Sequence, residues 1–229
     1  MLNFLRKLRR GNTKAGYIKY ALGEIILVVI GILIAVNINN WNEERKERVK
    51  ERQLLVKLQK ENEYNTSSLV NDSSYHNNVD MISYTLHRAL SAERSAKNDS
   101  IIEQKLVEGF RSSIFTFSSK YLERYINNSD IMTDGLVEDL VELKDAQNNL
   151  NQISQMVFDY KFDKIFGYLE PYFDSYEGKI DNIESLRTRT FINRIVTLDN
   201  LEESQVDIYQ DCLELHLRLD SLLKKRLEE

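Results

Sequence analysis

An apolar stretch near the start of the chain constrains the fold more than any other feature of the sequence. Residues 20–38 read YALGEIILVVIGILIAVNI, and no polar side chain interrupts the run from Ile25 to Val36. About 19 residues of α-helix extend roughly 28 Å, which is enough to cross the hydrocarbon core of a bilayer. We therefore predict a transmembrane helix over residues 20–41. The alternative is a cleaved signal peptide, but Ala35-Val-Asn is a poor cleavage site and a long segment precedes the apolar run.

Aromatic and basic residues around this stretch predict its orientation. Tyr17 and Tyr20 stand before the apolar run and Trp41 follows it, and aromatic rings favour the headgroup level of a membrane. The tail 1–19 carries six basic residues, namely Arg6, Lys7, Arg9, Arg10, Lys14 and Lys19. Because positive charge resists translocation, we expect the N-terminus in the cytoplasm and the rest of the chain outside it. The expected location is a bacterial inner membrane, crossed once, with a periplasmic C-terminal domain.

Four residues of the predicted transmembrane helix share one face at helical spacing: Glu24, Val28, Gly31 and Ala35. The small residues at 31 and 35 would let a second helix approach closely, which predicts a homo-oligomer formed through the anchor. A carboxylate in a membrane helix is a candidate for an ion or proton role. Glu24 also lies only about one turn from Tyr20, so it could instead reach the interface. A stripe that merely faces lipid is the remaining alternative.

The anchor also resembles a known family. The run YALGEIILVVIGILIA at 20–35, followed by NNWNEER at 39–45, is similar to the N-terminal signature of a domain-of-unknown-function family. Its members are small single-pass bacterial membrane proteins, best known from the Bacteroidota. The likeness covers residues 17–46. Beyond it, FSSKY at 117–121 and NNSD at 127–130 are loosely similar to the family's middle region, although the glycine of the family's loop is absent here. The resemblance implies an anchor and a helical domain, and no activity.

The composition of the chain predicts that the part outside the membrane is helical. Only one proline and eight glycines occur among 229 residues, and strands and hairpins need such turn residues. We therefore expect an all-α protein in which the transmembrane helix continues into an antiparallel helical bundle. The single cysteine excludes an intramolecular disulfide and cysteine-based metal or redox motifs. The formal net charge of −5 argues against nucleic acid as a partner.

The sequence after the anchor divides into two parts. Residues 42–53 are charged on every side and have no apolar stripe, which is typical of a helix surrounded by solvent. We expect a charged juxtamembrane helix there. Leu54, Leu55 and Leu58 then begin a buried face, so a helical domain outside the membrane is predicted over residues 54–229.

Local signals predict where helices begin and end within this domain. A second helix is plausible from Asp72, the capping box SIIE at 100–103 favours a start just after Asp99, and DNLE at 199–202 resembles another start. The longest helical pattern is that of residues 135–169, and Pro171 should end or kink it. A polar run at 127–130 predicts a loop.

Histidine and cysteine offer little chemistry in sequence. His76, Asp80, Ser83 and His87 share a face if one helix carries them all, but two rings eleven residues apart lie some 16 Å apart along the axis, too far for one metal ion. We therefore expect no metal site. Cys212 falls on an apolar stripe of the last helix and should be a buried hydrophobe, not a nucleophile. His216, on the same helix, has no evident catalytic partner.

Residues 158–176 hold eight aromatic residues, the densest aromatic segment of the chain. Tyrosine and phenylalanine supply rigid contact area, so this segment is the candidate for a ligand pocket or a partner surface. The residues of this possible partner surface are Tyr160, Tyr168, Tyr172, Phe173 and Tyr176. The alternative is an ordinary core with tyrosines at its boundary.

Motifs that signal an enzyme are absent from the sequence. It contains no glycine-rich phosphate loop, no His-Glu-x-x-His, no nucleophile elbow and no cysteine-rich metal spacing. We expect no catalytic residue and no cofactor, and a non-enzymatic interaction or scaffold protein whose partners are the lipid bilayer and an unknown protein. The alternative function is that of a subunit of an oligomeric membrane assembly that conducts or couples ions through the anchor helix, with Glu24 lining the ion path. An enzyme whose catalytic residues lie in a helical cleft is a more distant alternative.

Overall fold

The computed structural model describes residues 14–228 except 77, 129–134, 175 and 178. The chain divides into two compact units, Met1–Gln53 and Leu54–Glu229. Helices make up most of the chain, and the only strands among the described residues are β1 (Phe173–Asp174) and β2 (Lys179–Ile180), which pair antiparallel. The prediction of an all-α protein with a long apolar N-terminal helix and an antiparallel bundle is confirmed.

The first unit is dominated by the helix α2 (Lys14–His76), which begins there and ends in the second unit. Between Tyr20 and Trp41 this helix contains the apolar stretch, and none of the side chains in its most apolar window is buried. Among the described residues this is the one helix long and apolar enough to cross a membrane. The segment 42–53 is helical and mostly exposed, as a run of strong helix formers without proline or glycine should be.

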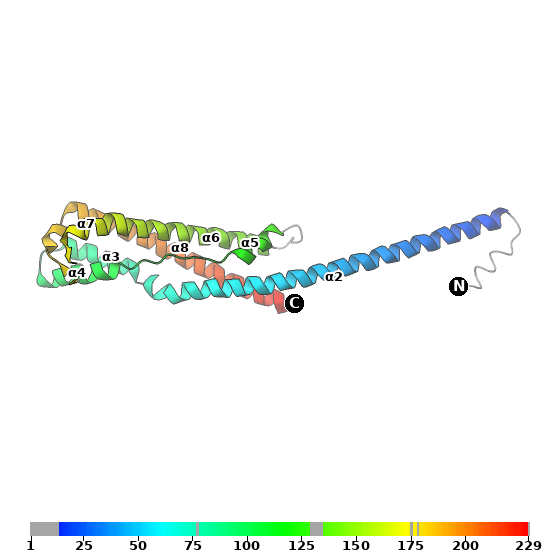
Figure 1. The fold of residues 1–229 in the computed structure, drawn as a ribbon, viewed down its shortest axis with the longest axis horizontal. Helices are drawn as coiled ribbons and strands as arrows, with labels where there is room; N and C mark the ends of the chain where they lie inside the picture. The colour runs from blue at the N-terminus through cyan, green and yellow to red at the C-terminus, as the bar shows by residue number, and fades with distance from the viewer. Residues whose placement is uncertain (1–13, 77, 129–134, 175, 178, 229) are drawn as a thin grey trace. The chain divides into compact units, whose positions relative to one another are not determined.

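The second unit is a bundle in which α6 (Leu136–Tyr160) and α8 (Arg189–Glu228) pack side by side (Figure 1). At one end α3 (Val79–Ser91) packs against α4 (Ala96–Gly109) and α8. The shorter elements are α5 (Lys120–Asn127), the π-helical segment η2 (Lys161–Phe166), α7 (Gly167–Leu169) and the 3₁₀ turns η3 (Glu170–Tyr172) and η4 (Ile183–Leu186).

Several predicted helix boundaries are wrong. The helix α4 begins at Ala96, because Ser95 accepts a hydrogen bond from the Asn98 backbone N–H (3.1 Å) and so caps the helix ahead of the predicted capping box. The run at 199–202 lies inside α8, whose buried face continues through it. Asp72 lies inside α2.

The other local predictions have mixed outcomes. The regular α-helix of the 135–169 pattern ends at Tyr160 and continues as η2 and α7, so the change comes well before Pro171, which lies in η3. A loop is predicted at 127–130. Its first residue, Asn127, is instead the last residue of α5, and positions 129 and 130 lie outside the described residues.

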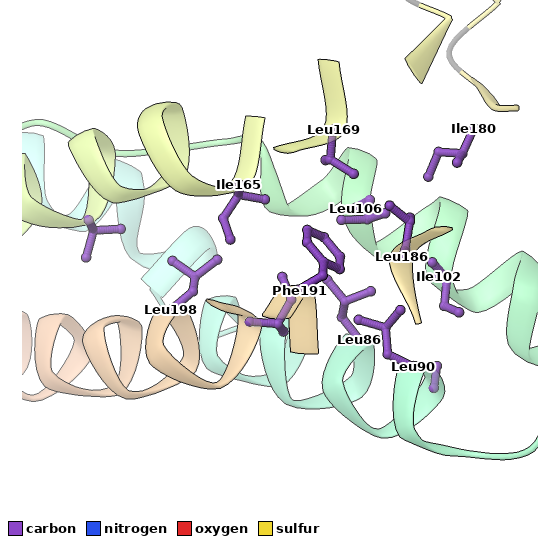
Figure 2. Close-up of a cluster of buried hydrophobic side chains, with 13 residues drawn as sticks. Leu86, Leu90, Ile102, Leu106, Ile165, Leu169, Ile180, Leu186, Phe191 and Leu198 are labelled. Atoms are coloured by element: carbon purple, nitrogen blue, oxygen red, sulfur yellow. The ribbon is translucent and has the colours of Figure 1, made fainter. Parts of the chain in front are cut away.

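The buried apolar side chains among the described residues of the second unit form three clusters, which follow one another along α8. The first surrounds Phe191, whose ring lies among aliphatic side chains of α3, α4, η2 and α8 (Figure 2). The middle one contains Leu69, Phe115 and Tyr209, and the last contains Leu58, Leu140 and Leu219. Burying each large apolar side chain contributes roughly 1.5–3 kcal/mol, so these clusters are the main source of the bundle's stability.

A segment without helix or strand connects α4 to α5, and we call residues 111–119 the strap. Its side chains alternate: Ser113 and Phe115 are buried, whereas Ile114 and Thr116 are exposed. The strap runs along the bundle from the end of α4 to the start of α5 (Figure 1). Its contacts with α2 proceed from Asp72 back to Glu61, so the two segments run antiparallel.

Candidate functional site

The most distinctive surface of the bundle is a row of phenylalanine rings where α6 passes into η2. Phe158 stacks on Phe162 with ring centroids 6.5 Å apart, and Phe162 stacks on Phe166 at 6.0 Å, with interplanar angles of 9° and 11°. Phe162 is 62% exposed, and the other two rings are also exposed. π-Helical segments are rare and are found frequently at functional sites.

These rings border a pocket of about 240 Å³, which we call the aromatic pocket. Its lining residues are Phe110, Ser112, Phe158, Lys161, Phe162 and Phe166. Phe110 closes one side, with its ring edge-on to Phe166 at 5.9 Å. Pockets that hold drug-sized ligands measure about 300–1,000 Å³, so this one suits an apolar side chain better than a cofactor.

Lys161 lines the aromatic pocket, but its ammonium group is already bound from within. Nζ lies 2.6 Å from Glu202 Oε1 and donates hydrogen bonds to Tyr75 Oη (3.1 Å) and to the Arg111 backbone oxygen (2.8 Å). Two of its N–H groups are therefore donated in hydrogen bonds, and its charge is paired with that of the Glu202 carboxylate. The pocket therefore offers apolar contact area and no spare cation for an anionic ligand.

Glu202 is fully buried behind the pocket on α8. Its second carboxylate oxygen accepts a hydrogen bond from the Ser83 hydroxyl. Burial raises the pKa of the Glu202 carboxyl, and the Lys161 ammonium opposes that shift. The sequence interpretation missed this residue because it treated 202 as part of a cap. The signal was its spacing, seven residues after Ile195 and four after Leu198, on the buried stripe of α8.

Other buried polar side chains form hydrogen bonds between helices. Gln205 donates to the Ser154 hydroxyl (3.0 Å), and His216 lies between Asn62 Oδ1 (2.6 Å) and Gln147 Nε2 (3.1 Å). These pairs join α8 to α6 and α2. Cys212 is buried among them, and burial raises the pKa of its thiol to about 12, which confirms the prediction of a buried hydrophobe.

The predicted stripe of the anchor is exposed along α2. Glu24, Val28, Gly31 and Ala35 are all solvent-facing within a single chain. A Cβ added at Gly31 would meet nothing within 4 Å, so a larger residue would fit there in the monomer.

The predicted interface aromatics are described in part. Trp41 is 59% exposed, with the Arg45 guanidinium 5.9 Å from its ring centroid. Tyr20 is half-buried, and the side chain of Tyr17 lies outside the described residues.

The predicted partner surface divides into inward and outward residues. Four of its five residues, Tyr160, Tyr168, Tyr172 and Phe173, pack partly against the first apolar cluster. The Tyr160 hydroxyl donates to the Arg194 backbone oxygen (3.2 Å), and the Tyr168 ring stacks on Phe191 at 4.9 Å. Tyr176 is 98% exposed. The exposed row of the same aromatic segment is formed instead by Phe158, Phe162 and Phe166.

The histidine face read from sequence is divided between two helices. His76 is the last residue of α2, whereas Ser83 and His87 lie on α3, and the side chain of Asp80 lies outside the described residues. In the part of the chain that the structure describes, no group of three His, Cys, Asp or Glu side chains is arranged to hold a metal ion.

Comparisons of the chain with protein-family models, with curated proteins and with solved structures find no match.

The buried ion pair generates a stability prediction. Lys161→Met or Glu202→Leu alone leaves one charge buried without its partner, so each should reduce the free energy of unfolding by about 3–5 kcal/mol. The double variant replaces both charges with apolar side chains and should lose less than the sum of the two single variants. Urea denaturation followed by circular dichroism measures all three.

The matched control is Lys179→Ala. Lys179 lies 2.9 Å from Glu177, but both side chains are more than half exposed, so its loss should cost less than about 1 kcal/mol. Equal losses for the buried and exposed pairs would contradict the assignment of Lys161 and Glu202 as a desolvated pair.

Proposed function

We propose that the protein is a membrane-anchored, non-enzymatic interaction or scaffold protein that binds an apolar segment of another protein in the aromatic pocket. The observation that supports this most is the exposed row of Phe158, Phe162 and Phe166 beside the pocket. The charged groups behind the row are engaged with one another, which favours binding through contact area over bond-making chemistry.

The exposure of the three rings is costly unless something covers them. Each ring loses the free energy that burial of its apolar surface would supply, and contiguous exposed apolar surface marks interaction sites. Aromatic side chains are also enriched at the centres of protein interfaces, where a few anchors carry most of the binding energy. Stacking of the three rings on a helical segment preorders them, which reduces the entropy lost on binding.

The first functional prediction concerns Phe162, the most exposed ring of the row. A photo-crosslinking amino acid at position 162, introduced in the full chain in its native cells, should give one dominant cross-linked protein. With that partner purified, Phe162→Ser should weaken binding at least about tenfold, equivalent to about 1.4 kcal/mol. Titration calorimetry or surface plasmon resonance measures the change.

The matched control is Val141→Ser on α6, because Val141 is 41% exposed and does not line the pocket. It should leave both the cross-link and the affinity unchanged. If both serine variants bind the partner as tightly as the natural protein, the aromatic pocket is not the binding site.

We also propose a single-pass inner-membrane location with a cytoplasmic N-terminus and a periplasmic bundle. The basic tail supports this orientation, and so does the resemblance of residues 17–46 to a family of single-pass bacterial proteins. Alkaline phosphatase fused after Glu229 should therefore be active, and green fluorescent protein at the same position should be dark. The opposite pattern of reporters would reverse the orientation.

The second candidate function is an oligomeric assembly that conducts or couples ions through the anchor. The observation that favours it is the exposed stripe that places Glu24 on the same face as Gly31 and Ala35. Gly31→Ile should weaken association measured by cross-linking in membranes, because added bulk would keep two backbones apart. Glu24→Gln should abolish ion flux in liposomes if this function holds, and should leave partner binding at the aromatic pocket unaffected.

Gly23→Ile is the matched control for Gly31→Ile. A Cβ added at Gly23 also meets nothing within 4 Å, but Gly23 does not belong to the face formed by Glu24, Val28, Gly31 and Ala35. If natural and Gly31→Ile proteins associate to the same extent, the stripe only faces lipid.

A further inference from the structure

Two of the three histidines of the chain lie beneath the strap. The ring of His76 is sandwiched between Tyr209, 4.2 Å away and nearly parallel, and Phe115 of the strap at 5.4 Å. The ring of His216 stacks against Phe117 of the strap at 5.8 Å. Both histidines are fully buried, so both inward-facing rings of the strap rest on imidazoles, the side chains whose ordinary pKa lies closest to neutral pH.

The polar contacts at the start of the strap surround His76. Asp72 accepts hydrogen bonds from Arg111 Nη2 (2.6 Å) and from the Ser113 hydroxyl. His76 Nε2 lies 3.5 Å from the same carboxylate, and neither ring nitrogen of His76 has a hydrogen-bond partner among the described residues. This histidine is therefore held mainly by aromatic rings, and the one carboxylate beside it already accepts hydrogen bonds from Arg111 and Ser113, which suits a neutral imidazole better than a charged one.

The far end of the strap is fixed to α2 as well. The Asn65 side chain donates to the Ser118 backbone oxygen (2.8 Å) and accepts from the Ser118 backbone N–H (3.0 Å). Glu61 accepts hydrogen bonds from the Ser118 hydroxyl and from the backbone N–H groups of Tyr121 and Leu122. Between these two anchored ends, the strap is held mainly by the contacts of Phe115 and Phe117.

The groups that face each histidine decide its charge. The titratable and charged groups around His76 come from four elements: Asp72 and the Tyr75 phenol on α2, Arg111 on the strap, Lys161 on η2 and the Tyr209 phenol on α8. Burial is the largest effect and lowers the pKa of His76 to about 4, with Asp72 opposing the shift and both cations adding to it.

The surroundings of His216 are simpler. It faces neutral partners, namely Asn62 on α2, Gln147 on α6 and Phe117 on the strap. Burial alone lowers the pKa of this ring, also to about 4.

We propose that the strap is an acid-released clasp, in which protonation of His76 and His216 frees residues 111–119 from the bundle and exposes the middle apolar cluster. Beneath the closed strap a charged imidazole is removed from water: His76 has one carboxylate, Asp72, 3.5 Å from its ring, and His216 has only neutral neighbours. Water solvates both charged rings once the strap has left. The helices of the bundle keep their own packing, so the release is local.

The direction and size of the effect follow from linkage. A histidine with a pKa of about 4 when covered and 6.5 when exposed binds protons more readily in the open state. The closed strap is therefore fully favoured above about pH 6.5 and loses that advantage as the pH falls toward about 4. At about pH 5 each such histidine multiplies the opening equilibrium about 30-fold.

The proposal also bears on the aromatic pocket, because Ser112 of the strap is one of the residues that line it. Release of the strap would remove Ser112 from the lining of the pocket and so change the site proposed to bind a partner. Only this effect on binding rests on the proposed function; the release of the strap does not.

The chain contains its own reporter of strap release. Cys212, the only cysteine, is fully buried in the same cluster as Phe115. In the full-length protein in detergent, its reaction with 4,4′-dithiodipyridine is normalised to a small free thiol at each pH. Two factors of about 30 multiply, so the normalised rate should accelerate about 900-fold between about pH 7.5 and about pH 5. Far-ultraviolet circular dichroism should keep the helical signal over the same range.

Variants separate the two buried histidines from the third. His76→Phe and His216→Gln should each reduce the acceleration about 30-fold, and the double variant should show almost none. His87→Gln is the matched control, because His87 is partly exposed on α3 and should leave the acceleration as in the natural protein. An unchanged normalised rate across this pH range, or full acceleration in the double variant, would overturn the proposal.

Because these variants replace buried side chains, the natural protein supplies a second test. Pulsed hydrogen–deuterium exchange after acidification should deprotect residues 111–119 while α6 stays protected. Simultaneous deprotection of the strap and α6 would mean that acid unfolds the whole bundle, and the clasp would be refuted. Neither measurement uses the partner, so failure of the proposed binding function would leave the outcome unaffected.

Discussion

The bundle depends on one continuous buried stripe along α8. Ten residues of this 40-residue helix are buried at alternating spacings of four and three: Phe191, Ile195, Leu198, Glu202, Gln205, Tyr209, Cys212, His216, Leu219 and Leu223. That spacing keeps one face of the helix turned toward its neighbours over its whole length. Because members of the stripe occur in all three apolar clusters, the clusters are held in line by a single helix.

The polar members of the stripe give it a defined register. Glu202 pairs with Lys161 on η2, Gln205 with Ser154 on α6, and His216 with groups on α2 and α6. Apolar contacts alone would tolerate a slide of one helix past another. A slide of one turn would leave these buried groups unpaired at about 1–3 kcal/mol each, so they favour one arrangement over its shifted alternatives.

The sequence predicts the architecture well and the interior chemistry poorly. The scarcity of proline and glycine and one long apolar run suffice for an all-α chain with a membrane-length helix. The start signals at 100–103 and 199–202 mislead, because both runs lie inside helices that packing extends past them. In the sequence Glu202 is part of a cap-like run and His216 has no evident catalytic partner, because the groups that contact them in the fold lie far away in sequence.

The aromatic segment shows where helical periodicity stops being informative. Its concentration of rings was visible in sequence, but which rings face outward depends on η2, where wider π-helical turns change the phase of the side chains after Tyr160. The inward tyrosines and the outward row of Phe158, Phe162 and Phe166 therefore emerge only in three dimensions.

The short helix α5 depends on a residue far away in the sequence. Eight residues are too few for a stable isolated helix, and Ser119 at its start makes no side-chain cap. The backbone N–H groups of Tyr121 and Leu122 are satisfied instead by Glu61, about sixty residues earlier on α2. Glu61 thus takes the place of the missing cap, and the structure of α5 depends on its contact with α2 more than on its own sequence.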